Sequence, residues 1–535
     1  MYSGIALAAL ACAVLLLWYR ILGRRSTIQD IIGPPSPSWI FGHLLQLMLS
    51  PGYGDYEFKW LKAHGPVYRL KVCFGQDRLM VADPLALQYI FNSPHFALSP
   101  ILQNMVRLVF GDGALLGLRG TVYIYFGLLA DNVIGQTHKR LRNEFNMAFT
   151  IAAVRNYHPI FQKVAQAITQ GLEASATPLI NVVPLLATAT LSSIAEAALS
   201  YSMDDLEKEF IAANAQIMRV APTILLNPTI HKGFRAAASN QSAGQIFFAD
   251  ALMRHLPSWL LRAAIYLPTE TFKIARRAQY LANQLVGGED IFGMLLNLDR
   301  TDTTRNGLTG EEVITQTAII MIAGQEATTN TIAFGLLELA KNTDFQELLR
   351  AEIQSMLGAA GDSIQYDKMP LLNAFIKETL RFYPAEPSTE RMALHDTVIP
   401  LSQSITTSTG EKVTQIPIRK GELVIAGIAS YQRLEWRWGD DAHEFRPSRW
   451  LEGSVSKGEA AGPYANLLTF LGGPHTCLGW RFAVLEMQVL VSELVGKFSF
   501  ALPENDPVRV RVANTLQPTM LDGQKGVPLL VTRLL

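Results

Sequence analysis

The residues from Thr309 to Asn342 form the longest uninterrupted helical pattern of the chain, and they set the scale of the fold. Thr309 and Glu312 have the spacing of a capping box, in which each side chain bonds a backbone amide near the other. A helix of about 30 residues extends roughly 45 Å, enough to cross a whole domain. The sequence therefore predicts one large domain with this helix passing through it.

Two further helices and several short strands are expected around this long helix. Residues 371–382 have a helical pattern that ends before Pro384, because a residue that precedes proline is biased away from the α conformation. Another helix should follow Cys477, over residues 479–498. Strand-like segments lie at 67–72, 79–81, 398–401 and 422–425. The predicted fold class is mainly α with small β-sheets.

The composition favours one well-filled core and argues against several classes of protein. Of the 535 residues, 49% are hydrophobic and 17% are charged, so a disordered chain is not expected. The 46 basic and 46 acidic residues balance, which gives no indication of nucleic-acid binding. Three cysteines without a CxxC pair argue against a disulfide framework or a structural zinc site, and favour a reducing compartment.

The amino terminus has the pattern of a membrane anchor. Residues 4–19 are almost wholly apolar, and two more apolar residues after Arg20 extend the run to the roughly 20 residues that a spanning helix needs. Arg24 and Arg25 follow, and no basic residue precedes the run, so the positive-inside rule places the rest of the chain in the cytoplasm. We predict a transmembrane helix within residues 1–25. A cleaved signal peptide is the alternative.

The remaining chain divides into a hinge and one domain. Three prolines make residues 26–42 a semi-rigid hinge, because proline fixes the backbone angle φ. Residues 43–535 contain no low-complexity break, repeat or long linker, so they are expected to form a single large domain. Within it, the apolar residues 246–267 could either enter the membrane or form helix core.

The segment from Phe470 to Gly479 has the features of a loop built around a metal-binding thiolate. Gly472, Gly473 and Gly479 allow a tight backbone path, so that amide groups can point at the sulfur of Cys477 and tune it. Phe470 could cover the sulfur, and the helix that follows offers the positive end of its dipole to an anionic ligand. The alternative is an inert buried cysteine.

This segment resembles the haem-binding loop of the cytochromes P450, F-x-x-G-x-R-x-C-x-G. Phe470, Gly473, Cys477 and Gly479 match the pattern, and His475 stands where the family usually has arginine. The resemblance implies that Cys477 is the axial ligand of the iron of haem b. It also implies that Phe470 lies against the cofactor and that His475 contacts a haem propionate.

Three more residues resemble propionate-binding positions of the family. His138 and Arg142 lie four apart on a probable helix, and Arg391 follows the end of the helix before Pro384. Propionates are anions, so several donors converging on them would be stabilising. For each residue alone, the alternative is an ordinary surface charge.

Glu378, Arg381 and Arg449 resemble the structural triad of the same family. Glu378 and Arg381 are three apart and share a helix face, and Arg449 lies between them and the cysteine in the sequence. A buried Glu–Arg pair is costly unless its hydrogen bonds are completed, so a third partner is expected. The implied role is scaffolding beneath the haem.

The middle of the long helix reads Ala-Gly-Gln-Glu-Ala-Thr-Thr and resembles the oxygen-activation segment A-G-x-D/E-T-T. Gly324 is expected to loosen the helix and leave a groove for dioxygen. Glu326 and Thr328 are the implied proton-relay residues. Ala327 replaces the usual first threonine, so either Thr328 or an ordered water would supply the hydroxyl, or proton delivery would be less tightly coupled. Two later hydroxyls are expected to bond the helix backbone: Thr329 and Thr331.

The resemblance implies a fungal-type, microsomal haem-dependent monooxygenase that oxidises a lipophilic small molecule, such as a terpenoid secondary metabolite. No complete G-x-G-x-x-G fingerprint is present, so electrons must come from a separate protein. The implied donor is NADPH–cytochrome P450 reductase, with cytochrome b5 as a second candidate and Arg481 in the docking face. The expected location is the endoplasmic reticulum membrane, with the catalytic domain facing the cytoplasm. The alternatives are an electron-independent isomerase or dehydratase, and a catalytically dead haem-binding membrane protein.

Residues 121–135 interrupt the resemblance. Deleting these 15 residues joins Gly120 to Gln136 and restores the family spacing before His138. Because codons at both ends can encode splice-site sequences, we hypothesise a retained short intron that is translated in frame. A natural loop insertion is the alternative, and it would favour a catalytically dead protein because it would lie beside the haem.

Sequencing of mature transcripts tests this hypothesis. We expect messages in which the codon for Gly120 is followed directly by the codon for Gln136. Genomic DNA sequenced across the same region serves as the control, and it should contain all 15 intervening codons. A mature message that always retains those codons would establish the insertion as part of the protein.

Overall fold

The structure is a computed structural model. It describes residues 26–48, 50, 52–100, 102–103, 130–199, 266, 273, 276–277, 310–359, 365–453, 455, 461–504, 508–512 and 515–534. The predicted transmembrane helix and most of the apolar segment 246–267 lie outside these residues. So do residues 121–129 of the anomalous insertion, whereas residues 130–135 form the first turns of a helix. Among the described residues, no helix combines the length and the apolar character that crossing a bilayer requires.

The fold is mainly helical with small sheets, as predicted. The helices are α2 (Leu44–Met48), α3 (Glu57–His64), α4 (Pro84–Asn92), α6 (Ala130–Asn146), α7 (Ile151–Asn156), α8 (His158–Glu173), α9 (Val182–Leu199), α15 (Gly310–Lys341), α16 (Thr343–Ala359), α17 (Pro370–Phe382), α18 (Ile428–Tyr431), α19 (Glu435–Trp438) and α20 (Trp480–Lys497). Short 3₁₀ turns occur at η1 (Cys73–Gly75), η4 (Met147–Phe149), η8 (Tyr366–Lys368), η9 (Pro447–Trp450) and η10 (Gly473–His475).

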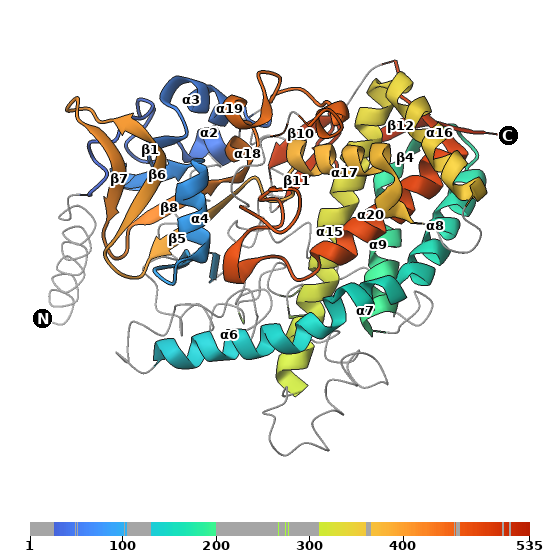
Figure 1. The fold of residues 1–535 in the computed structure, drawn as a ribbon, viewed down its shortest axis with the longest axis horizontal. Helices are drawn as coiled ribbons and strands as arrows, with labels where there is room; N and C mark the ends of the chain where they lie inside the picture. Colours follow the sequence, from blue (N-terminus) through green and yellow to red (C-terminus); the bar gives the residue numbers. More distant parts are fainter. Residues whose placement is uncertain are drawn as a thin grey trace, which may run out of the picture.

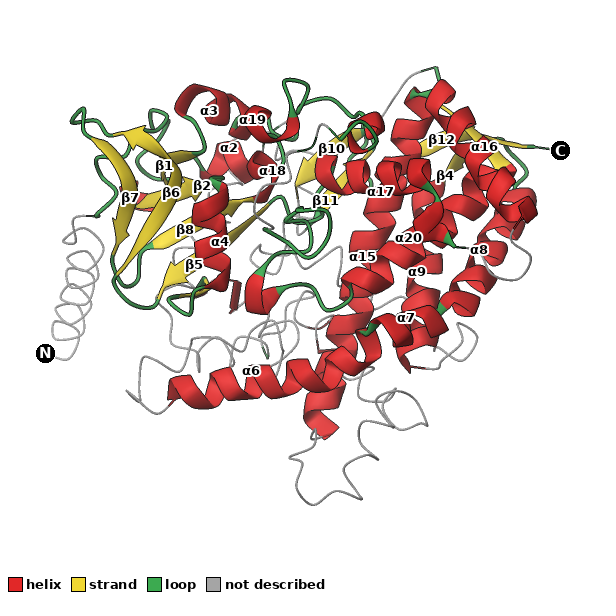
Figure 2. Ribbon diagram, in the orientation of Figure 1, coloured by secondary structure: helices red, strands yellow, loops and turns green. Residues whose placement is uncertain are grey.

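The strands are β1 (Val67–Lys71), β2 (Asp77–Val81), β3 (Phe96–Leu98), β4 (Leu179–Asn181), β5 (Ser388–Ala393), β6 (Thr397–Thr406), β7 (Lys412–Ile418), β8 (Leu423–Gly427), β9 (Phe498–Ala501), β10 (Arg509–Val512), β11 (Leu516–Thr519) and β12 (Pro528–Arg533). The largest sheet has the order β1-β2-β8-β5-β3, in which only the β2–β8 pair is parallel. Figure 2 shows this sheet and the β6–β7 hairpin on one side of the molecule and most of the long helices on the other.

The predicted elements agree closely with the observed ones. The three predicted helices are α15, α17 and α20, each confirmed to within one residue at either end. The four predicted strand segments fall in β1, β2, β6 and β8. The long helix α15 passes through the helical part of the molecule beside α9 and α20 (Figure 1). Residues 328–340 of α15 are buried among neighbouring elements, which accounts for the apolar pattern of this part of the helix.

Asn342 separates the two consecutive helices α15 and α16. Its backbone amide donates to the Glu338 and Leu339 carbonyls at 3.1 and 3.2 Å, which closes the last turn of α15. Its side-chain oxygen accepts from the Phe345 amide at 3.0 Å and caps the first turn of α16. Asparagine is among the preferred residues for such a cap, so one residue ends one helix and begins the next.

Helix α15 continues through Gly324 without the expected local break. A Cβ atom built on Gly324 would lie 2.8 Å from Cγ1 of Ile194 on α9, so a neighbouring side chain fills the side of this residue that faces α9. The glycine therefore allows two helices to approach closely.

Substitution of Gly324 tests this packing role. We expect Gly324→Val to destabilise the protein by about 1–3 kcal/mol, because overpacked interiors must shift side chains or backbone. The measurement is the midpoint of urea unfolding at unchanged slope. The control is Gly171→Ala in α8, where the added Cβ would meet Leu185 at an ordinary 3.5 Å. Gly324→Val with the stability of the control variant would show that the helices have room at this point.

Candidate functional site

The loop that carries Cys477 comprises residues 470–479, includes η10 and leads into α20, and its backbone is tightly fixed. The Cys477 amide donates to the Phe470 carbonyl at 2.9 Å and closes the loop. Leu471 and Gly473 adopt left-handed φ angles of 57° and 65°. A Cβ on Gly473 would lie 2.2 Å from the carbonyl oxygen of Phe91 on α4, so only glycine fits this contact. The sequence thus folds into a loop that is held against α4.

The thiol of Cys477 is accessible, yet surrounded by protein. The residue is solvent-exposed, although the protein atoms around its sulfur raise the pKa of the thiol by desolvation. The Gly479 amide, hydrogen-bonded to the thiol, and the charge of Arg142 both act to lower the pKa. The expected amide directed at sulfur is therefore present, but the thiol needs a further cation to ionise fully.

Helix α6 brings His138 and Arg142 to the cysteine loop. His138 is buried, and the centroid of its ring lies 4.9 Å from that of His475. Arg142 donates through Nη2 to the Thr476 carbonyl, next to the cysteine. Burial lowers the pKa of Arg142, and the negative charge of the Cys477 thiolate opposes this shift. Two imidazoles and one guanidinium thus gather around the loop.

Arg391 lies on β5 and is linked to the same region through α4. Its Nη1 donates to Thr389 Oγ1 at 2.8 Å and to the Glu390 carbonyl at 3.1 Å. The guanidinium lies 5.3 Å from the ring centroid of Phe91, the residue whose carbonyl abuts the cysteine loop. Burial lowers the pKa of Arg391 to about 10, against the effect of the Glu386 carboxylate.

Aromatic rings cover the other side of the loop. Phe470 is buried and makes an edge contact with Tyr464 at a centroid distance of 6.3 Å. Tyr464 also packs against Trp480 at 6.0 Å, and Arg481 lies 4.2 Å over the Trp480 ring. The start of α20 is therefore fixed to the loop by side-chain packing as well as by the backbone.

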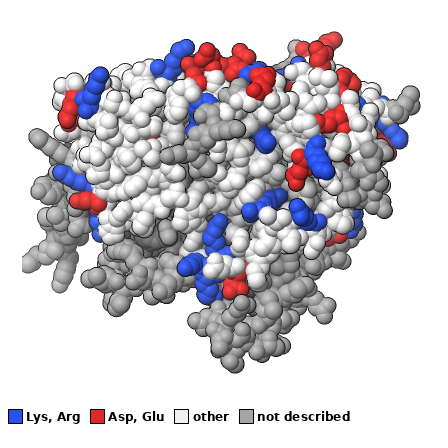
Figure 3. Space-filling view, viewed as in Figure 1, with Lys and Arg blue, Asp and Glu red and all other residues white. Residues whose placement is uncertain are grey.

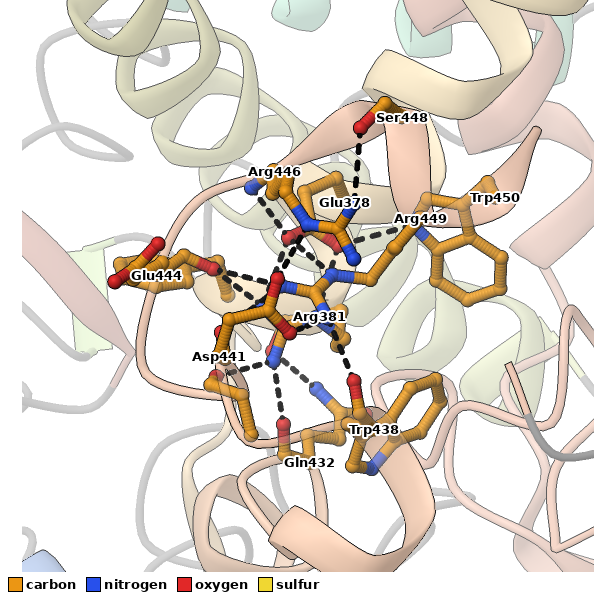
Figure 4. Close-up of polar contacts among 12 residues, drawn as sticks. Glu378, Arg381, Gln432, Trp438, Asp441, Glu444, Arg446, Ser448, Arg449 and Trp450 are labelled. Carbon is orange, nitrogen blue, oxygen red and sulfur yellow. Dashed lines mark hydrogen bonds and ion pairs between the residues drawn. The ribbon is translucent and has the colours of Figure 1, made fainter. Parts of the chain in front are cut away.

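Figure 4 shows the buried carboxylate of Glu378 at the centre of a polar cluster. Arg381, one turn later on α17, donates to both of its oxygens, Nε to Oε2 at 2.9 Å and Nη2 to Oε1 at 2.8 Å. Arg449 on η9 donates to Oε1 at 2.9 Å. Trp450 Nε1 and the Arg446 amide also donate to this carboxylate, at 2.9 and 2.8 Å. The structure thus brings Glu378, Arg381 and Arg449 together.

The other donors of the two buried arginines are bonded to oxygen atoms of the surrounding loop. Arg381 and Arg449 together bond the carbonyls of Gln432, Trp438, Asp441, Ala442 and Glu444 and a carboxylate oxygen of Asp441. Burial alone would raise the pKa of Glu378, but its hydrogen bonds and the charges of Arg381 and Arg449 outweigh burial and lower it. The carboxylate is therefore ionised, and its charge is balanced.

Gln432 connects this cluster to the cysteine loop. Its Nε2 donates to the carbonyls of Leu380 and Arg381 at 3.1 and 2.8 Å. Its Oε1 accepts from the Leu468 amide at 3.0 Å and from Thr469 Oγ1 at 3.1 Å, immediately before the loop begins. Sequence reasoning missed Gln432, because nothing in its local sequence marks a residue whose partners are so far away in the chain.

Glu326 and Thr328 lie on α15 with buried side chains. Glu326 Oε1 accepts from Gln517 Nε2 at 2.7 Å and from Lys525 Nζ at 3.2 Å. Its second oxygen, Oε2, is buried and has no hydrogen-bond partner in the described part of the chain. Gln517 and Lys525 were also missed from the sequence, because they belong to a carboxyl-terminal hairpin without a recognisable motif.

The two later hydroxyls of this helix behave as predicted. Thr329 Oγ1 donates to the Gln325 carbonyl at 2.8 Å, and Thr331 Oγ1 donates to the Ala327 carbonyl at 2.8 Å. Both therefore bond the helix backbone one turn earlier, a common arrangement for threonine inside a helix.

Comparison with known proteins identifies the group to which these features belong. A family model described as Cytochrome P450 matches residues 32–519. Cytochrome P450 monooxygenase 91 and cytochrome P450 monooxygenase 81 of Postia placenta are 29% and 28% identical, over 98% and 95% of this chain and 98% and 93% of their own lengths. Cytochrome P450 monooxygenase claW of Ampulloclitocybe clavipes is 28% identical over 96% of this chain and 94% of its own.

The residues around Cys477 fit haem b, the cofactor of this family. A cysteine thiolate is a suitable ligand for haem iron, and Cys477 would hold the iron in this form. The nearby Arg142 and Arg391 and the two imidazoles offer charge and donors to propionate anions. The donor set therefore matches an anionic, iron-containing macrocycle.

Removal of one arginine tests the Glu378 cluster. We expect Arg449→Met to destabilise the protein by about 3–5 kcal/mol in urea unfolding, because a buried carboxylate loses a partner. Because the pKa of Glu378 is lowered in the folded protein, its ionised form stabilises the fold at pH values above the unfolded-state pKa. This stabilisation is lost as the pH falls through the folded-state pKa. The loss caused by the substitution should therefore shrink as acid protonates Glu378.

A surface ion pair provides the control for this experiment. Arg533, which is 69% exposed, lies 3.4 Å from Glu173. Arg533→Met should change stability by at most about 1 kcal/mol, the upper value for exposed pairs. Equal effects of the two substitutions would contradict the structural role assigned to the cluster.

Proposed function

Because the chain belongs to the cytochrome P450 family and is a haem-dependent monooxygenase, we propose that it oxidises a lipophilic small molecule with electrons from a separate NADPH-dependent reductase. The observation that carries this proposal is the accessible thiol of Cys477 in a closed loop, with the Gly479 amide directed at its sulfur. A thiol held in this way is suited to bind iron and to remain bound through reduction.

The residues of the loop have distinct tasks in this proposal. Haem b, when bound, supplies the redox chemistry that activates dioxygen. Cys477 would ligate the iron and donate electron density, while Phe470 would shield the sulfur from water. His138, Arg142, Arg391 and His475 would hold the propionates by charge and hydrogen bonding.

Proton delivery is assigned to α15. Glu326 is a buried acid whose Oε2 can accept and release a proton, and Thr328 supplies a hydroxyl two residues later. Ala327 has no hydroxyl, so a water bonded to Thr328 or Glu326 would complete the path. This arrangement leaves proton delivery more dependent on Glu326 than it would be with two hydroxyls.

Electrons would come from NADPH–cytochrome P450 reductase, with cytochrome b5 as a second candidate donor. The chain has no complete dinucleotide fingerprint of its own. Figure 3 shows lysine and arginine side chains gathered over the region of α6, and this helix contacts the cysteine loop through Arg142. Arg481, stacked on Trp480 at the start of α20, would contribute a further positive charge to the docking face that we propose.

The substrate class follows from the proposed location. An apolar amino terminus would hold the enzyme at the endoplasmic reticulum membrane with its catalytic domain in the cytoplasm. Lipophilic compounds concentrate in that membrane, and the relatives named above are monooxygenases of fungi. A secondary metabolite such as a terpenoid is therefore the substrate that we propose.

Substitution of the cysteine tests the proposed ligand. We expect Cys477→Ser to lose the red-shifted Soret band of the reduced carbon monoxide complex, together with all NADPH-dependent product, because serine cannot replace the thiolate. Cys73→Ala, at a buried cysteine elsewhere, should keep both. An unchanged spectrum in Cys477→Ser would overturn the assignment.

Labelled dioxygen tests the reaction class against the two alternatives. With reductase, NADPH and a panel of terpenoids, a product that contains one atom from dioxygen indicates a monooxygenase reaction. Product formed without reductase or NADPH would identify an isomerase or dehydratase, which Ala327 favours. Absence of both product and thiolate spectrum would identify a catalytically dead protein.

A further inference from the structure

Glu326 has two unlike oxygens. Oε1 is bound twice, by Gln517 Nε2 at 2.7 Å and by Lys525 Nζ at 3.2 Å. Oε2 is buried without a hydrogen-bond partner among the described residues. A buried carboxylate oxygen without a partner is unfavourable, so it is kept in place only when the other oxygen is firmly held. The two hydrogen bonds to Oε1 therefore orient the carboxylate.

The two groups that hold Oε1 come from a single hairpin. Gln517 lies on β11, and Lys525 lies beyond the following turn, where it forms a bridge with Thr519. The turn is closed by the Met520 amide, which donates to the Gln524 carbonyl at 2.8 Å. A short hairpin of this kind fixes the separation of its side chains, so an amide and an ammonium group are presented together to one carboxylate oxygen.

The hairpin also docks on α15 at a second point that does not involve Lys525. Asn330, one turn after Glu326, donates through Nδ2 to the Leu516 carbonyl and to Thr515 Oγ1, both at 3.1 Å. Its side chain is buried. The loss of the lysine would therefore leave Glu326 with one of its two donors, Gln517, without releasing the hairpin from the helix.

The ion pair lies between solvent and interior. The side chain of Lys525 is 30% exposed and that of Glu326 is 5% exposed. Burial lowers the pKa of Lys525, whereas the Glu326 charge and hydrogen bond act to raise it. The negative charge of Glu326 therefore favours the ammonium form of Lys525 and partly offsets the effect of burial.

We propose that Lys525 is a positioning residue for oxygen activation: with Gln517 it clamps Oε1 of Glu326, so that Oε2 is the oxygen that handles the proton. This inference rests on the proposed monooxygenase function. No covalent or redox step is assigned to Lys525. Without the clamp the carboxylate turns between rotamers, and protons reach reduced oxygen less productively.

The test compares Lys525→Met with Lys525→Arg in the full-length holoenzyme with its reductase. We expect the hydrogen peroxide released per NADPH consumed to rise roughly tenfold in Lys525→Met, because small displacements of a catalytic group lower rates by up to about 100-fold. Lys525→Arg keeps a charged donor and should restore a ratio near that of the unaltered protein. The exposed Lys412→Met is the matched control and should change nothing.

A second measurement reports on the carboxylate itself. Infrared difference spectra of the resting holoenzyme should contain a Glu326 band, identified by its loss in Glu326→Gln, which shifts in Lys525→Met and not in Lys412→Met. A structural role of Lys525 alone would leave this band unchanged.

The outcomes separate the inference from the proposed function. If the unaltered enzyme lacks a thiolate spectrum and oxygen reduction, the proposed function fails. If the unaltered enzyme is active while Lys525→Met leaves the peroxide ratio or the Glu326 band unchanged, the clamp is refuted and the monooxygenase assignment stands.

Discussion

The ion cluster around Glu378 is the interaction on which the candidate site depends. One fully buried carboxylate is matched by two guanidinium groups and two further hydrogen-bond donors. Other N–H groups of the arginines donate to carbonyls of the segment 432–444. Such a cluster is costly to bury and strongly destabilising to break, so it fixes the relative position of α17, η9 and that segment. Gln432 then transmits this position to the residues that precede the cysteine loop.

The two sides of the site are built by different means. On the thiolate side, the backbone determines where Cys477 lies. It does so through residues with left-handed φ angles, a glycine packed against α4 and an amide directed at the sulfur. The oxygen side is a side-chain construction on a continuous helix, in which Glu326 is oriented by a hairpin from the end of the chain. A loop fixed by its backbone suits a permanent ligand, whereas an acid held by side chains can change its hydrogen bonds during a reaction cycle.

Local sequence patterns predicted the helices well, but they did not predict contacts between residues that lie far apart in the sequence. The apolar periodicity and proline positions placed α15, α17 and α20 to within one residue, because helix formation and termination are decided by nearby residues. The short motif around Cys477 likewise predicted its loop. The close approach of Ile194 to Gly324 was not predicted, because Ile194 belongs to another helix. Lys525 and Gln432 could not be found, since an isolated polar residue carries no mark of a partner far along the chain.

The central claim is that the loop anchored by this cluster places the sulfur of Cys477 on the iron of haem b. X-ray absorption at the iron edge of the purified holoenzyme measures that bond directly. We expect one sulfur neighbour in addition to the porphyrin nitrogens, in both the resting and the reduced states. An iron environment of nitrogen and oxygen alone would contradict it.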